Sequence, residues 1–181
     1  MAKPGRIRVH DKVFERSIEF HEIDAVIERM AGELEQDIGG RNPLFLAILN
    51  GAFMFAADLL KKIPFACEIS FVKVASYTGT ESTQTVRQLI GLDEDISGRT
   101  VVILEDIVDS GLTIRDVRSF LQEKNAGEVL IATLLHKPEA FRGDYPIDYV
   151  GMEIPNDFIV GYGLDYNRHG RNYRDIYKIV E

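Results

Sequence analysis

Residues 101–113 read VVILEDIVDSGLT, and this stretch constrains the fold more than any other part of the chain. Four apolar residues run into the carboxylate pair Glu105 and Asp106, and a third carboxylate, Asp109, follows after two further apolar residues. Small and hydroxyl residues come next, and apolar residues then recur at the spacing of one helix face. These are Ile114, Val117, Phe120 and Leu121. The pattern predicts a buried strand, an acidic tip, a short loop and the start of a helix.

The predicted loop has the chemistry of a phosphate site. The first N–H groups of a helix lack intrahelical acceptors, and together with the positive end of the helix dipole they bind anions. Carboxylates beside such a site suit sugar hydroxyls, Mg²⁺ or a proton, so the stretch favours a phosphorylated sugar over a nucleoside triphosphate. Acidic strand ends also occur in response-regulator receivers and other α/β domains, whose ligands bind at the carboxyl ends of strands. The stretch alone leaves those alternatives open.

Two common nucleotide-binding motifs are absent from the sequence. The chain has no GxxxxGKS or GxxxxGKT segment, which excludes a P-loop nucleotide hydrolase. It has no GxGxxG segment either, because Gly161 and Gly163 are not followed by the third glycine.

Predicted strands and helices alternate along the rest of the chain. Helices are expected over residues 22–38, 52–62 and 115–124. Strands are expected over residues 44–49, 66–76, 101–104, 129–135, 148–154, 158–162 and 176–180. The polar residues 77–92 lack apolar periodicity and predict a long loop, of the kind that often forms a lid. The alternation predicts an α/β fold with a mostly parallel twisted sheet flanked by helices, and the short C-terminal strands predict a small hood lobe.

Length and composition are those of an ordinary globular protein. The 181 residues suit a single domain over residues 1–181, with the hood formed by N-terminal and C-terminal segments. The net charge of −8 argues against a nucleic-acid surface, which would be basic. The one cysteine, Cys67, lies in an alternating segment from Phe65 to Phe71, which predicts a buried strand residue and no intrachain disulfide. We see neither a signal peptide nor an apolar run of ~20 residues, and expect a cytoplasmic protein with no membrane partner.

The acidic stretch resembles the phosphoribosyl-pyrophosphate (PRPP) motif of the type I phosphoribosyltransferases. Further segments resemble one branch, the hypoxanthine-guanine phosphoribosyltransferases, in the order in which that family has them. They are residues 49–60, 75–83, 134–138 and 157–172. The resemblance implies the type I phosphoribosyltransferase fold and a purine salvage enzyme. Such an enzyme transfers the 5-phosphoribosyl group from PRPP to N9 of hypoxanthine or guanine with Mg²⁺, yielding IMP or GMP and pyrophosphate. It also implies a homodimer or homotetramer.

The resemblance assigns roles on the PRPP side of the site. Glu105 and Asp106 resemble the pair that binds the ribose hydroxyls and Mg²⁺. The loop resembles the one that binds the 5′-phosphate. Its residues are Asp109, Ser110, Gly111, Leu112 and Thr113. Asp109 also resembles the family's proposed general base toward purine N7, and a neighbouring phosphate would make its carboxylate a better proton acceptor. The alternative role for Asp109 is a hydrogen-bond acceptor that only positions the purine.

Other segments resemble the parts that hold pyrophosphate and close the site. Asn50 and Gly51 resemble the pyrophosphate-binding turn, where many members have a lysine or arginine before the glycine. Here that side-chain charge is lost, while the backbone N–H groups remain. Members often have a cis peptide at this turn, and the sequence does not decide this for Asn50. Arg171 resembles a pyrophosphate clamp. Ser76 and Tyr77 resemble the head of a mobile loop that would exclude water from the reacting centre.

The remaining assignments concern the purine. Lys137 resembles the lysine that donates to O6, and an ammonium suits a 6-oxo group better than a 6-amino group. Phe158 resembles the aromatic residue that stacks on the base, and Ile159 would contact the base edge through its backbone. Asp165 resembles a second Mg²⁺ ligand beside the purine. Residues near Ile159 and Asp165 could also favour xanthine. A further alternative of another class is a PRPP-sensing regulator without catalytic activity.

Overall fold

A computed structural model describes residues 5–78 and 85–180 of the chain and shows two sheets. The larger sheet has six strands in the order β5-β4-β3-β6-β7-β8. Their bounds are Leu44–Leu49 for β3, Glu68–Thr78 for β4, Thr85–Ile90 for β5, Thr100–Val108 for β6, Glu128–His136 for β7 and Tyr149–Glu153 for β8. All neighbouring pairs are parallel except β4 and β5, which are antiparallel. The predicted mostly parallel sheet is confirmed.

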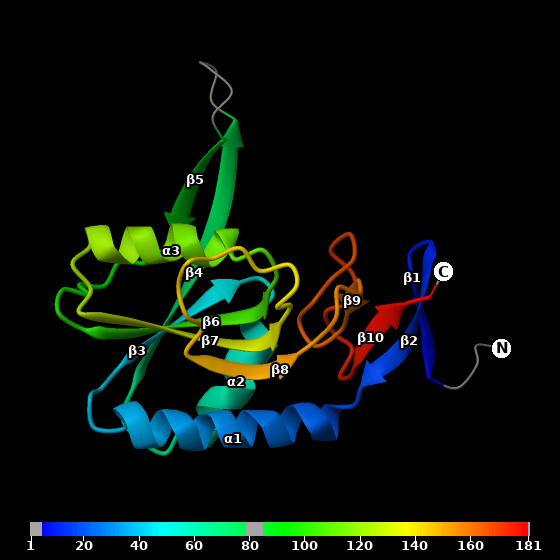
Figure 1. The fold of residues 1–181 in the computed structure, drawn as a ribbon, viewed down its shortest axis with the longest axis horizontal. Helices are drawn as coiled ribbons and strands as arrows, with labels where there is room; N and C mark the ends of the chain where they lie inside the picture. Colours follow the sequence, from blue (N-terminus) through cyan, green and yellow to red (C-terminus); the bar gives the residue numbers. More distant parts are fainter. Residues whose placement is uncertain (1–4, 79–84, 181) are drawn as a thin grey trace.

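Helices cover both faces of this sheet (Figure 1). Helices α1, Phe20–Ile38, and α2, Phe53–Lys62, lie on one side, and α3, Leu112–Glu123, lies on the other. Two separate apolar clusters fill the layers, one under α1 and α2 and the other under α3. Strand β3 contributes to both clusters, because its apolar residues alternate between the two faces. The central strands are therefore held rigidly, and their carboxyl ends are fixed in position.

A small antiparallel sheet forms the hood. Its strands are β1, Arg6–Val9; β2, Lys12–Ile18; β9, Ile159–Val160; and β10, Ile176–Ile179, in the order β1-β2-β10-β9. Figure 1 shows this sheet beside the end of the large sheet toward which β7 and β8 point. The two N-terminal strands were not predicted, because few of their side chains are buried and they pair with a segment far away in the sequence. Val9 and Phe14 are their buried apolar residues.

The prediction of one long loop over residues 77–92 is wrong where the structure describes the chain. Strand β4 continues to Thr78, and residues 85–90 form β5. The two strands make a hairpin arm that extends past α3 in Figure 1, and residues 79–84 lie outside the described part. Backbone pairing holds such an arm together, so it needs no apolar face that a sequence pattern could reveal.

The alternation from Phe65 to Phe71 was also misinterpreted. Ile69 and Phe71 are 37% and 42% exposed, whereas Ser70 and Val72 are buried, so the opposite face of β4 is the one that packs under α3. Cys67 is half-buried and lies just before β4, so it is not the buried strand residue that was expected. Helices α1 and α2 do not cover the face of β4 that carries Ile69 and Phe71, and the local sequence pattern could not show this.

Candidate active site

The site lies where the parallel strands end and the hood begins. Strand β6 continues to Val108, beyond Leu104, which is its last residue paired with β3. Glu105 and Asp106 occupy this extension, and neighbouring side chains of a strand point to opposite faces. Glu105 accordingly lines a cavity of about 90 Å³ at the strand end, whereas Asp106 lines a cleft of about 310 Å³ shared with the hood.

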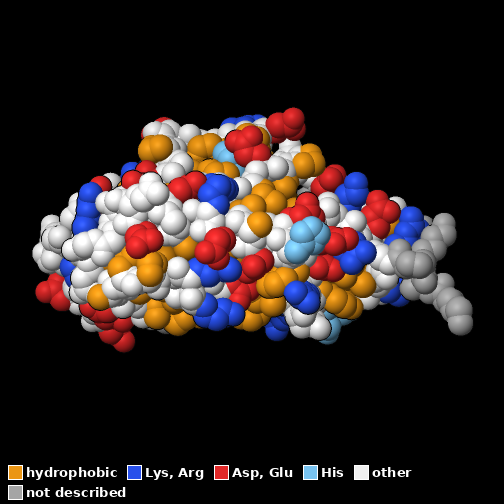
Figure 2. Space-filling view, turned by 90° about the horizontal axis from the view of Figure 1, so that it is seen from below, with side chains coloured by type: hydrophobic (Ala, Val, Ile, Leu, Met, Phe, Trp, Pro, Cys, Tyr) orange, Lys and Arg blue, Asp and Glu red, His pale blue; other side chains and the backbone are white. Residues whose placement is uncertain are grey.

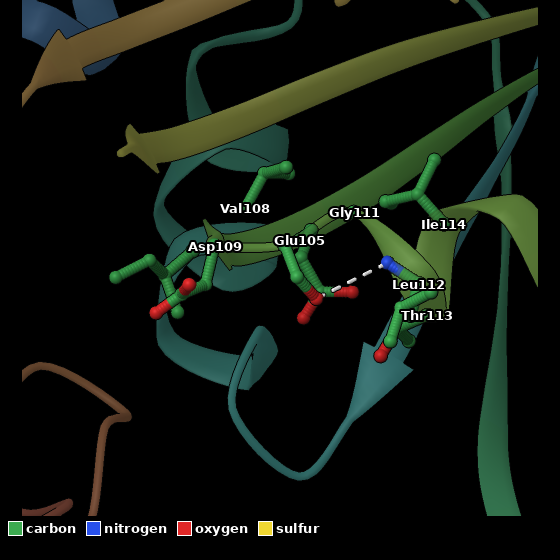
Figure 3. Close-up of a pocket in the computed structure, with 9 residues that line it drawn as sticks. Glu105, Val108, Asp109, Gly111, Leu112, Thr113 and Ile114 are labelled. Carbon is green, nitrogen blue, oxygen red and sulfur yellow. Dashed lines mark hydrogen bonds between the residues drawn. The ribbon is translucent and has the colours of Figure 1, made fainter. Parts of the chain in front are cut away.

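One continuous segment encloses the smaller cavity. It is lined by Glu105, Ile107, Val108, Asp109, Ser110, Gly111, Leu112, Thr113 and Ile114. Figure 3 shows Asp109 on one side of Glu105, and Leu112 and Thr113 on the other. Gly111 has a φ of 84° and directly precedes α3, so the chain turns sharply and presents the helix N-terminus to the cavity. All residues of the predicted phosphate loop are therefore gathered around one small cavity that suits an anion.

The two neighbouring carboxyl groups lie in surroundings that disfavour negative charge. Glu105 is 8% exposed and Asp106 is 6% exposed. Burial, and after it the charge of Asp106, raises the pKa of Glu105 well above its ordinary value. Burial also raises the pKa of Asp106. Oε2 of Glu105 is fully buried, and no described residue donates a hydrogen bond to it. The pair therefore offers oxygen atoms that fit a hard cation such as Mg²⁺, or sugar hydroxyls.

Lys137 and Asp109 form an ion pair in the larger cleft. Nζ of Lys137 donates to Oδ2 of Asp109 at 3.0 Å. The lysine side chain is 10% exposed and the aspartate side chain 55% exposed, so the lysine reaches the cleft from within the protein. The backbone N–H of Lys137 donates to the carbonyl of Val108 at 2.9 Å, which fixes the two strand ends beside each other. The cleft thus offers a cationic donor next to an anionic acceptor.

The hood contributes an aromatic ring to the same cleft. Phe158 is 46% exposed, and its ring contacts those of Tyr166 and Phe14, with centroids 5.8 Å and 6.2 Å away. These contacts hold the ring while leaving much of it open to a planar ligand. Ile159 starts β9 and lines the cleft directly beside Phe158.

Asp165 and Arg171 form a second ion pair on the hood side of the cleft. Arg171 contacts Oδ1 of Asp165 at 2.5 Å, and the backbone N–H of Arg168 donates to Oδ2 of Asp165 at 2.6 Å. Protein donors therefore engage both carboxylate oxygens of Asp165. Over residues 5–78 and 85–180, no three His, Cys, Asp or Glu side chains are grouped to hold a metal ion. Asp165 and Asp106, two of the predicted ligands, line the same cleft, and Glu105 lines the smaller cavity.

The predicted pyrophosphate turn lies at the contact between core and hood. The peptide between Leu49 and Asn50 is cis. A Cβ atom at Gly51 would overlap the Asp106 carboxylate, and one at Gly163 would overlap the carbonyl oxygen of Gly51. Backbone therefore packs directly against backbone and carboxylate here, which only glycine permits. The turn at Gly51 therefore packs directly against the side chain of Asp106.

Comparison with known proteins identifies the family. The family model for the phosphoribosyl transferase domain matches residues 18–167. The hypoxanthine-guanine phosphoribosyltransferase of Streptococcus pneumoniae strain R6 is 40% identical over 152 residues, which are 83% of this chain and 84% of that protein. The chain belongs to the hypoxanthine-guanine phosphoribosyltransferase family.

Solved structures of the family have the same fold. The Bacillus anthracis hypoxanthine-guanine phosphoribosyltransferase with a HEPES molecule in its active site gives a TM-score of 0.83 at 32% identity, covering 94% of this chain and 99% of that one. A Trypanosoma cruzi hypoxanthine phosphoribosyl transferase gives a TM-score of 0.82 at 30% identity, covering 96% and 95%. The family and the fold class predicted from the sequence are confirmed.

Two further observations concern the predicted loop residues Ser76 and Tyr77 and one residue, Tyr145, that was not predicted from the sequence. Ser76 and Tyr77 lie near the end of β4, paired with Arg87 and Val86 of β5. Tyr145 was missed, although its hydroxyl donates to the carbonyl of Gly111 in the predicted phosphate loop. Aromatic residues in the Gly- and Pro-containing segment 139–147 were the signal that could have drawn attention to it.

Proposed function

We propose that this protein transfers the 5-phosphoribosyl group from PRPP to N9 of hypoxanthine or guanine. It would release pyrophosphate and form IMP or GMP, as a glycosyltransferase of purine salvage. One observation carries the proposal: Glu105 and Asp106 separate an anion-binding cavity from a cleft that holds Lys137, Asp109 and an open aromatic ring. The names of the relatives, which are hypoxanthine-guanine phosphoribosyltransferases, support the same reaction.

The smaller cavity and its surroundings would hold PRPP. The 5′-phosphate would accept hydrogen bonds from the backbone N–H groups of the loop and from the hydroxyls of Ser110 and Thr113. Glu105 and Asp106 would bind the ribose hydroxyls and Mg²⁺. When bound, Mg²⁺ neutralises charge on the leaving pyrophosphate. The backbone N–H groups at Gly51 and the guanidinium of Arg171 would bind the pyrophosphate oxygens.

The larger cleft would hold the purine. The base would stack on Phe158, with the backbone at Ile159 along its edge. Lys137 would donate to O6, and Asp109 would accept from N7–H. A 6-oxopurine offers an acceptor next to a donor, so it can replace each partner of the ion pair with a hydrogen bond. A 6-amino group would instead place a donor against the ammonium of Lys137. Asp165 would remain beside the purine site as a ligand for a second Mg²⁺ once Arg171 turns to pyrophosphate.

Asp109 would also take part in the chemistry. As N9 forms a bond to C1′ of the ribose, the bond from C1′ to the pyrophosphate oxygen breaks. The purine ring then carries excess positive charge, and the proton on N7 passes to the carboxylate of Asp109. This assignment explains why the acceptor is a carboxylate at the edge of the phosphate loop, within reach of both the base and the ribose.

A steady-state assay with PRPP, Mg²⁺ and each of hypoxanthine, guanine, xanthine and adenine tests the proposal. We expect turnover with hypoxanthine and guanine and little with adenine, because a buried donor left unpaired rejects a substrate strongly. Adenine turnover comparable with that of hypoxanthine would contradict the assignment. Preference for xanthine would favour the second candidate substrate, and binding of PRPP without turnover of any base would favour a regulator.

The chain's other properties are proposed on coarser grounds. We propose that residues 1–181 act as one domain, because the cleft combines residues of the large sheet and the hood. A nucleic-acid partner does not fit the net charge of −8 or the interspersed acidic and basic side chains in Figure 2. Among the described residues, no helix has the length and apolarity to span a bilayer. We place the protein in the cytoplasm with no membrane partner.

We further propose a homodimer or homotetramer. The Trypanosoma cruzi structure concerns the role of the C-terminal region in the oligomeric state and enzymatic activity of that protein, which supports this proposal. Light scattering coupled to size-exclusion chromatography tests this proposal, and a mass of one chain at assay concentrations would refute it.

A further inference from the structure

We propose that Tyr145 is a positioning residue that sets the direction of the backbone N–H groups in the phosphate loop. The proposal rests on the proposed phosphate role of residues 109–113. Tyr145 lies in the connection between β7 and β8, and its hydroxyl donates to the carbonyl of Gly111 at 2.5 Å. It is 9% exposed, so this contact is made within the protein and not across solvent.

The same connection holds two consecutive carbonyl groups of the loop. The backbone N–H of Arg142 donates to the carbonyl of Ser110 at 3.1 Å, next to the bond from Tyr145 to Gly111. In a trans peptide the carbonyl and the following N–H point in opposite directions, and the peptides of the loop are trans. The carbonyl of Gly111 also accepts from the backbone N–H of Arg115 at 3.0 Å, so Tyr145 and helix α3 hold it together. With both carbonyls held in this way, the N–H groups of Gly111 and Leu112 are directed away from residues 142–145, toward the side where phosphate would bind.

Tyr145 is itself held tightly beneath the loop. The ring of Phe141 meets it edge-on at 5.5 Å between centroids, and the guanidinium of Arg118 lies 4.7 Å above its ring. A Cβ atom on Gly111 would lie 2.6 Å from Cε2 of Phe141 and 2.8 Å from Oη of Tyr145. Because the loop packs directly against the rings of Phe141 and Tyr145, Tyr145 fixes the position of the loop as well as its orientation. Burial raises the pKa of Tyr145, which keeps its hydroxyl a proton donor.

A matched pair of variants separates this role from a general structural one. Tyr145→Phe removes the hydroxyl at the loop. Tyr149→Phe removes the hydroxyl of a tyrosine that is 6% exposed and donates to Oδ2 of Asp37 at 3.0 Å, away from the phosphate cavity. Each variant loses one buried hydrogen bond, so thermal unfolding should show similar losses of stability. Phe141→Leu is a third variant, which weakens the packing against the Tyr145 ring but keeps the Tyr145 hydroxyl.

Calorimetric titration with ribose 5-phosphate reports on the phosphate loop and the ribose-binding acids without the pyrophosphate site, since this ligand carries the 5′-phosphate and the ribose but no pyrophosphate. We expect Tyr145→Phe to raise its Kd and the KM for PRPP about fivefold to tenfold, which is the range of one net hydrogen bond. kcat and the KM for hypoxanthine should change less than about twofold by the same reasoning. Tyr149→Phe should leave all these constants unchanged. Phe141→Leu should raise the Kd by a smaller factor and remains informative if Tyr145→Phe fails to fold.

Several outcomes would overturn the inference. They are an unchanged Kd in folded Tyr145→Phe, an equal rise in Tyr149→Phe, a loss of kcat without a change in KM, and no binding of ribose 5-phosphate by the wild-type protein. Wild-type protein that binds ribose 5-phosphate but turns over no purine would refute the proposed reaction while leaving the inference on Tyr145 standing.

Discussion

Nζ of Lys137 lies 3.0 Å from Oδ2 of Asp109, so the donor and the acceptor that face the cleft satisfy each other. The two groups belong to different strand ends, β7 and β6, whose backbones are joined by the bond from Lys137 to Val108. In the proposed reaction a purine would replace both partners of this pair. Each group would then have a partner in the complex, provided that the incoming edge carries an acceptor beside a donor.

Replacing the lysine tests this exchange. Lys137→Met should lower kcat/KM for hypoxanthine by about 100-fold or more, because the O6 atom loses a buried charged donor. Turnover of adenine should fall much less, so the ratio between the two bases should shrink. Steady-state kinetics with both bases gives the ratio, and Lys124→Met, at an exposed lysine of α3's C-terminus, is the control. An unchanged ratio of kcat/KM for hypoxanthine and adenine would mean that Lys137 does not distinguish a 6-oxo group from a 6-amino group.

Removing the proton acceptor tests the role of Asp109. Asp109→Asn keeps the size of the side chain but cannot take a proton, so the chemical step should slow by roughly 10²–10⁴-fold. PRPP binding should change little. Rapid quench under single-turnover conditions is needed, because product release can hide the chemical step in kcat. Asp93→Asn, at an exposed aspartate, is the control. A single-turnover rate of Asp109→Asn within a few-fold of wild type would leave Asp109 only a positioning role.

A bulky residue in the loop should block phosphate. Gly111→Val should raise the KM for PRPP more than about tenfold, since its φ of 84° disfavours a β-branched residue and its Cβ would lie 2.6 Å from Phe141. Gly98→Val is the matched control, because Gly98 has a φ of 71° with no atom within 4 Å of the added Cβ. Both variants carry the backbone strain, so a rise confined to Gly111→Val assigns the effect to the loop. Similar PRPP kinetics in the two variants would show that the loop has another role.

The buried acid pair predicts a pH-dependent stability. The raised pKa of Glu105 means that its contribution is fully present below the unfolded value of about 4.3 and is lost as pH rises through the folded value. Glu105→Gln cannot ionise, so it should become more stable than wild type as pH rises, by about 1.4 kcal/mol for each unit by which the pKa is raised. Urea unfolding in EDTA from pH 4.5 to 8 measures the difference, with exposed Glu153→Gln as the control. A difference that is the same at every pH would contradict the prediction.

Metal dependence is the fifth prediction. Glu105 and Asp106 supply carboxylate oxygen alone, which suits Mg²⁺ or Mn²⁺ and not zinc. Activity with PRPP and hypoxanthine should disappear in excess EDTA and return when Mg²⁺ exceeds the chelator. Full turnover in EDTA, with the chelator shown to remove Mg²⁺ from the assay, would exclude a required metal.

The parts of the fold that depend on local pattern could be predicted from sequence. The order of strand, acids, loop and helix at residues 101–113 was correct because each element is encoded by its own residues. The N-terminal strands and the exposed face of β4 were not predicted, because pairing with β10 and the cover of a sheet face are set by distant segments. The candidate site also has a part that is local in sequence and a part that is not. Residues 109–113 could be picked out from the sequence and line one cavity, whereas the contact of Tyr145 and the ion pair between Asp165 and Arg171 form only in the folded protein.

The pleat of β6 assigns two consecutive residues to different cavities, Glu105 to the smaller one and Asp106 to the cleft beside the hood. Inserting or deleting a single residue before them would exchange their faces, so each cavity would receive the other's carboxylate. Two similar buried acids are thus presented to different cavities because they are neighbours on one strand. The number of residues in this strand ahead of Glu105 therefore determines which cavity each carboxylate enters.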